Sequence, residues 1–215
     1  MQAFSYYGIL LSKTESKLSS TYTPAEMTTI IRRILSRSDI VFITDRNPIA
    51  EINYPIVSGK YDPDLDEDDM PAIEIAINYH PDQKEIRFMD IILDRFVIEI
   101  IETIMHELCH QGQYRKRNFR YPKKYKSINS NAALRREEIY LGNKDEIEAY
   151  AVGIATEIFL LNSQTVPIDI IAAINEIYSY QKYCSLFGVN HQVVKKLRKF
   201  IMRSLREFST TRQKS

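Results

Sequence analysis

Residues 106–110 read His-Glu-Leu-Cys-His, inside a stretch whose apolar residues recur at helical spacing. This spacing predicts a helix from about residue 97 to about residue 117. On such a helix the two histidines lie four residues apart, about 6 Å from each other on one face, so both imidazoles can reach one metal ion. Glu107 lies beside that face, where it can take a proton without binding the ion. The pattern therefore predicts a metal centre with an adjacent general base.

Two less specific interpretations of His106 and His110 stay open. They can be hydrogen-bonded core histidines, or they can hold a metal ion whose role is purely structural. The chain has only four histidines, so chance alone would give this pattern in about one such chain in two hundred.

The residues before this helix predict strands, and those after it predict helices. A short strand is expected at residues 40–44, a second at 50–57 and a β-hairpin at 72–92, where apolar and polar residues alternate. Thr23, Pro24 and Glu26 form a capping box that opens an earlier helix. Further helices are expected at about 130–141, 144–161, 167–187 and 190–208.

The predicted fold class is α+β and mostly helical. A small antiparallel sheet or β-hairpin would precede the active-site helix and a third-ligand helix, with extra helices at the C-terminus. Residues 1–161 are expected to form the main domain, with its core at 72–161. Residues 162–208 would form a helical extension that packs on it, and residues 209–215 a flexible tail.

A catalytic zinc ion needs a third protein ligand, and residues 145–151 offer two. Glu146 and Glu148 follow His110 by 36 and 38 residues. On a helical wheel Glu148 falls on the flank of the apolar side, whereas Glu146 falls on the polar side with Gly153. A carboxylate in apolar surroundings is costly unless a cation pairs with it. Glu148 is therefore the expected ligand, and Glu146 is the alternative.

The histidine motif and the later segment Asp145–Ala151 together resemble the small gluzincin-type zinc metallopeptidases of bacteriophages and bacteria. The resemblance covers roughly residues 72–161. It implies a zincin-like fold, one Zn²⁺ per chain and a peptide or protein substrate, which a metal-activated water hydrolyses with Glu107 as general base. The metzincin arrangement does not fit, because Lys116 stands where its third histidine would be.

Peptide hydrolysis also requires a group that stabilises the oxyanion, and a tyrosine can serve. Tyr150 is the expected residue because it shares the ligand helix. Tyr114, Tyr121 and Tyr140 are the other candidates.

The net charge is only +1, which predicts no global attraction to nucleic acid or to an anionic membrane. One local stretch is strongly basic, with aromatic residues interleaved, and could bind a nucleic acid or an acidic partner. Its cations are Arg115, Lys116, Arg117, Arg120, Lys123, Lys124 and Lys126. A solvated loop, or pairing with the acidic segment 62–69, are the alternative interpretations. An EF-hand in that acidic segment is excluded by Glu67 and Ile73, which stand where its glycine and last glutamate would be.

The N-terminus lacks the basic region of a signal peptide, and no apolar run approaches the length of a membrane span. Two cysteines form no disulfide framework. We therefore expect a cytoplasmic protein without a membrane partner. The resemblance adds the host cytoplasm or the virion as locations for a phage protein. The alternative function is a non-catalytic zincin-like component, for example of a phage particle, that binds protein or nucleic acid.

Overall fold

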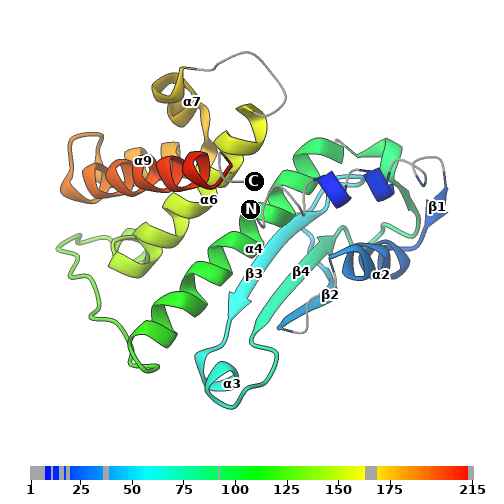
Figure 1. Ribbon diagram of the computed structural model, residues 1–215, viewed down its shortest axis with the longest axis horizontal. Helices are drawn as coiled ribbons and strands as arrows, with labels where there is room; N and C mark the ends of the chain where they lie inside the picture. Colours follow the sequence, from blue (N-terminus) through cyan, green and yellow to red (C-terminus); the bar gives the residue numbers. More distant parts are fainter. Residues whose placement is uncertain are drawn as a thin grey trace. The chain divides into compact units, whose positions relative to one another are not determined.

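The structure is a computed structural model that describes residues 8–10, 12–14, 17, 20–35, 39–91, 93–162 and 169–212. The chain is α+β and mostly helical, which confirms the expected class (Figure 1). It divides into two compact units, residues 2–111 and residues 112–215. The division falls inside one helix, α4 (Leu93–Lys116), and not near residue 161, where the main domain was expected to end.

Residues 2–111 contain a three-stranded sheet of mixed direction. Its order is β2 (Ile40–Arg46), β4 (Ile73–Tyr79) and β3 (Ile56–Tyr61). The central strand, β4, runs parallel to β2 and antiparallel to β3. The strand expected at residues 40–44 is confirmed, whereas the second expected strand begins only at Ile56.

The β-hairpin expected at residues 72–92 is wrong. Its first half is the central strand β4, and its second half, β5 (Ile86–Arg87), pairs with β1 (Thr21–Tyr22) in a separate sheet. The alternation of polar residues suggested a strand with one wet face. In the structure Ala76 and Asn78 are buried as well, so both faces of this central strand are covered.

Helix α2 (Pro24–Ile34) packs against β2 and begins as expected. The Thr23 hydroxyl accepts from the backbone N–H of Glu26, and the Glu26 carboxylate accepts from the backbone N–H of Thr23 at 2.8 Å. This capping box pairs two N–H groups that a helix start leaves without partners. Tyr79 of β4 and Thr28 of α2 share a buried hydrogen bond of 3.3 Å, which joins helix and sheet.

A single 3₁₀ turn, η1 (Phe88–Asp90), leads from β5 to α4. The first half of α4 is apolar and buried. Helix α4 lies beside β3 (Figure 1). At Gly59 the side chains of Thr103 and Glu107 approach the strand backbone. The apolar stripe expected from the sequence is thus the face by which α4 covers this unit.

Residues 112–215 form a helical unit with its own core. Helix α6 (Lys144–Asn162) packs mainly against α9 (Gln192–Arg212). Three shorter helices complete the core: α5 (Ala132–Leu141), α7 (Ile170–Glu176) and α8 (Tyr178–Phe187). The helix expected to carry the third ligand therefore shares a core with the C-terminal helices.

Two features at the end of the chain concern earlier expectations. Gly188 follows α8 with φ of 86°, a left-handed conformation that favours glycine and ends the helix. Helix α9 continues to Arg212, so residues 209–212 of the expected tail are helical, and residues 213–215 lie outside the described residues.

Among the helices that the structure describes, none combines the length and apolar character needed to cross a membrane.

Candidate metal centre

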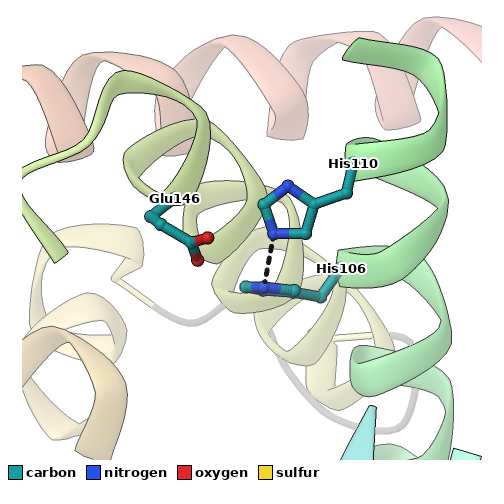
Figure 2. A group of neighbouring side chains, drawn as sticks. All are labelled: His106, His110 and Glu146. Carbon is teal, nitrogen blue, oxygen red and sulfur yellow. Dashed lines mark hydrogen bonds between the residues drawn. The ribbon is translucent and has the colours of Figure 1, made fainter. Parts of the chain in front are cut away.

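The two histidines of the motif face each other one turn apart on α4. Their Nε2 atoms are 3.1 Å apart, and their ring centroids are 4.8 Å apart with the planes at 76° (Figure 2). Two nitrogen ligands of a tetrahedral zinc ion are about 3.3 Å apart, given Zn–N bonds of about 2.0–2.1 Å. His110 is buried and His106 half-buried. The pair is therefore spaced either for one shared ion or for one hydrogen bond between the two rings.

Glu146, in the first turn of α6, completes a group of three. One ligand atom from each of His106, His110 and Glu146 lies within 4.8 Å of the other two, so the group could hold a metal ion (Figure 2). Two imidazoles and one carboxylate are a donor set that divalent transition metals accept. The Oε2 atom of Glu146 is buried, where a neighbouring cation stabilises a carboxylate most.

The end of α4 contacts the first turn of α6. Gln113 donates to the backbone oxygen of Asp145 at 3.1 Å and to the Glu148 carboxylate at 3.4 Å. Arg117 forms an ion pair of 2.6 Å with Asp145, whose side chain is 9% exposed. Gln113 lies in the last turn of α4 and Arg117 directly follows its last residue, so these contacts hold the start of α6 against the end of the histidine helix.

Glu148, the ligand expected from the sequence, has other partners. Its carboxylate forms an ion pair with Arg203 of α9 and accepts from Gln113. The group brought together in the structure contains the alternative, Glu146.

The helical wheel did not distinguish the two glutamates because α6 has no polar side. Gly153 and Glu157 lie on the side that the wheel marked as polar, and both are buried. The contrast between a wet face and an apolar face, on which the choice of Glu148 depended, is therefore absent over the described part of α6.

Glu107 is buried, with 6% of its surface exposed, and lies against β3. A Cβ atom placed on Gly59 would be 2.7 Å from both Cγ and Oε1 of Glu107. The glutamate therefore occupies space that any other residue at position 59 would take. Gly59 was not singled out from the sequence, although an isolated glycine inside a strand is a known sign of close backbone approach.

Two candidate tyrosines lie at Glu146. The Tyr140 hydroxyl hydrogen-bonds with Glu146 and with Tyr150. Burial of this hydroxyl, and after it the charge of Glu146, raise the pKa of Tyr140 far above its usual value, so it stays a hydrogen-bond donor. Tyr150 also contacts the buried Tyr183 edge to face, with ring centroids 5.5 Å apart.

The other two candidate tyrosines contact each other in a separate pair. Tyr114 and Tyr121 meet edge to face, with their centroids 5.7 Å apart and Arg117 over the Tyr114 ring. Tyr121 is 71% exposed. Burial raises the pKa of Tyr114, with a smaller contribution from Glu146.

The acidic segment 62–69 contains a short helix, α3 (Pro63–Glu67), which is capped by Asp62. Asp66 is buried and accepts hydrogen bonds of 2.9 Å from the Tyr61 hydroxyl and from the Gln111 amide. Within the described residues, the segment contributes to no group that could hold a metal ion. Asp66 instead links this segment to α4 through Gln111, the residue after His110. The sequence did not indicate this contact.

The basic stretch is exposed in the structure. Arg117 is half-buried at Asp145, and its other cations are solvent-exposed: Arg115, Lys116, Arg120, Lys123, Lys124 and Lys126. Residues 120–129 form no regular secondary structure. The stretch is thus an exposed basic loop that begins in the last turn of α4.

Comparisons with protein-family models, with curated proteins and with solved structures find no match to this chain.

Proposed function

We propose that this protein is a zinc metallopeptidase with a zincin-like fold, in which His106, His110 and Glu146 hold one Zn²⁺. The observation that carries the proposal is the group of three ligand residues with the buried Glu107 beside it. A purely structural zinc site does not need an additional buried carboxylate next to two of its ligands. The resemblance of residues 72–161 to gluzincin-type enzymes supports the same conclusion.

The chain's own residues suit such a reaction. When bound, zinc supplies a Lewis acid that polarises the scissile carbonyl and lowers the pKa of water. Glu107 takes a proton from the attacking water and delivers it to the leaving amine. Burial between α4 and β3 at Gly59 limits the positions that its carboxylate can adopt.

The Tyr140 hydroxyl, which contacts Glu146, and its partner Tyr150 are the candidates for stabilising the oxyanion. The Tyr140 hydroxyl remains a neutral donor at physiological pH, because burial and the Glu146 charge raise the pKa of Tyr140. Tyr140 also donates to Glu146, which orients this carboxylate toward the histidines.

The test combines metal analysis with a peptide library. Purified wild-type protein should carry one zinc ion per chain and cleave a subset of peptides. The Glu107→Gln variant should keep its zinc and lose at least about 100-fold in turnover, since general-base catalysis contributes about 10²–10⁴. Glu102→Gln, on the same helix, is the matched control and should retain both properties.

Two results would overturn the proposal. Protein that folds but takes up no divalent metal would exclude the metal centre. Fully zinc-loaded wild type that cleaves none of a broad peptide library would exclude the enzyme and favour a non-catalytic zinc-binding component.

A further inference from the structure

The small net charge of the chain conceals a strong separation of charge between the two units. Residues 112–215 carry 19 Lys and Arg against 9 Asp and Glu, a net charge of +10. Residues 2–111 carry 10 against 19, a net charge of −9. The helical unit therefore produces a positive field that the overall value of +1 does not reveal.

Two acid-free segments account for this positive charge. Residues 108–136 hold nine cations and residues 177–206 hold seven, and neither contains an Asp or Glu. The first includes the exposed basic loop, and the second includes most of α9.

Helix α9 presents its cations as a stripe. Lys195, Lys199 and Arg206 fall within about 40° of one another around the helix, with Arg203 and Lys196 at the side of the stripe. All five are solvent-exposed. Side chains four residues apart on a helix are about 6 Å apart, which is similar to the separation of successive phosphates along a nucleic-acid strand.

Each of the two basic segments contacts the first turns of α6 through one arginine. Glu148 accepts from Arg203 of α9 and, at 3.4 Å, from Gln113 in the last turn of α4. Arg117, next to the loop, forms an ion pair with Asp145. Each basic segment thus uses one arginine to anchor itself on α6 and leaves its remaining cations exposed.

We propose that the basic loop and the α9 stripe together bind a single-stranded nucleic acid. The exposed cations would contact phosphates, and Tyr121, 71% exposed in an irregular loop, would stack on a base. A membrane surface fits less well, because the apolar side of α9, from Val193 to Leu205, is buried in the core and cannot insert into lipid. This surface does not depend on the proposed metal centre.

The test is fluorescence anisotropy of the full-length protein with a labelled single-stranded oligonucleotide at several salt concentrations. If six phosphates are contacted, affinity should fall about 100-fold or more between about 50 and 200 mM salt. Replacing Lys123, Lys124 and Lys126 by Gln, or Lys195, Lys199 and Arg206 by Gln, should each weaken binding at least about ten-fold. Each triple variant should also reduce the logarithmic salt slope by about 2, at about 0.7 per lost contact.

The matched control replaces Arg32, Arg33 and Lys84 by Gln. These three cations are exposed on the other unit, so the control has the same net charge as the triple variants. It should bind like the wild type. Tyr121→Leu should weaken binding about ten-fold to the single strand and leave duplex binding unchanged.

Several outcomes would overturn the proposal. If the control variant binds the oligonucleotide as weakly as the two triple variants, binding depends only on net charge and not on this surface. Tighter binding to duplex than to single strand would exclude the single-stranded class. Phosphatidylserine vesicles that bind as tightly as the oligonucleotide would identify a membrane surface. Polyglutamate that competes as well as the unlabelled strand would identify an acidic protein partner.

Discussion

Gly59 of β3 lies so close to Glu107 of α4 that position 59 has no room for a side chain. A Cβ there would lie 2.7 Å from Cγ and Oε1 of Glu107, and 2.7 Å from Cγ2 of Thr103. Strand and helix are therefore packed against each other at the residue proposed as the general base. This packing gives a way to displace Glu107 without changing it.

The Gly59→Ala variant should displace Glu107 and lose turnover by about 100-fold while it keeps its zinc. Overpacking of this kind costs about 1–3 kcal/mol, so its free energy of unfolding should fall by that amount. Peptide cleavage, metal content and urea unfolding measure the three effects. The control is Gly112→Ala, since a Cβ there meets nothing within 4 Å, and it should stabilise α4 by up to about 1 kcal/mol. Unchanged turnover in Gly59→Ala would show that the position of Glu107 is not critical.

The two candidate ligands can be separated by single substitutions. Glu146→Gln should lower zinc affinity at least about 100-fold, more than the loss of an indirect contact normally costs. Glu148→Gln should keep that affinity and lose only its partly exposed ion pair with Arg203, worth about 1 kcal/mol or less. Competition titration with a chelator measures both affinities. The reverse pattern would restore Glu148 as the ligand.

Tyr140→Phe removes the hydroxyl that donates to Glu146 without changing the ring. If this hydroxyl orients the ligand, zinc affinity should fall about ten-fold. If the Tyr140 hydroxyl stabilises the oxyanion instead, zinc affinity should be unchanged, and kcat should fall with little change in KM. Tyr178→Phe, at an exposed tyrosine of α8, should change neither property. A Tyr140→Phe variant identical to the wild type in both would exclude this tyrosine from the site.

Alkaline pH should destabilise the protein through its buried tyrosines. Burial raises the pKa of Tyr79 to about 12, whereas an exposed tyrosine ionises near pH 10. A raised pKa means that the folded state holds its proton longer, so this stabilisation is complete below about pH 10 and is lost as the pH rises toward 12. Urea unfolding from pH 8 to pH 11 should show a falling free energy above about pH 10. Tyr79→Phe, although less stable at pH 8 without its hydrogen bond to Thr28, should show a shallower fall.

Local sequence signals predicted the parts of this molecule that depend on neighbouring residues. The capping box at Thr23 and Glu26, the helix that carries the histidines and the end of α8 at Gly188 follow from side chains within a few positions of one another. The pairing of His106 with His110 belongs to the same class, because four residues of helix bring any two such side chains to one face.

Long-range packing decided the rest. β4 became a central strand and not half of a hairpin, because partners from residues 40–46 and 56–61 cover both its edges. Gly59 and Glu107 meet across 48 positions of the chain, and no periodicity encodes that contact. The choice between Glu146 and Glu148 as the proposed third ligand was based on which side of α6 is buried, and α6 is buried on nearly every side.

The sequence alone determined a helix with two histidines and a neighbouring glutamate, because local backbone geometry sets the spacing within a helix. Only the tertiary structure groups Glu146 with the two histidines while Glu148 pairs with Arg203, and only it brings Arg117 and Arg203 to the first turns of α6. The physical reason is that the free energy of folding depends on which apolar surfaces are buried against each other. Those surfaces belong to residues far apart in the chain.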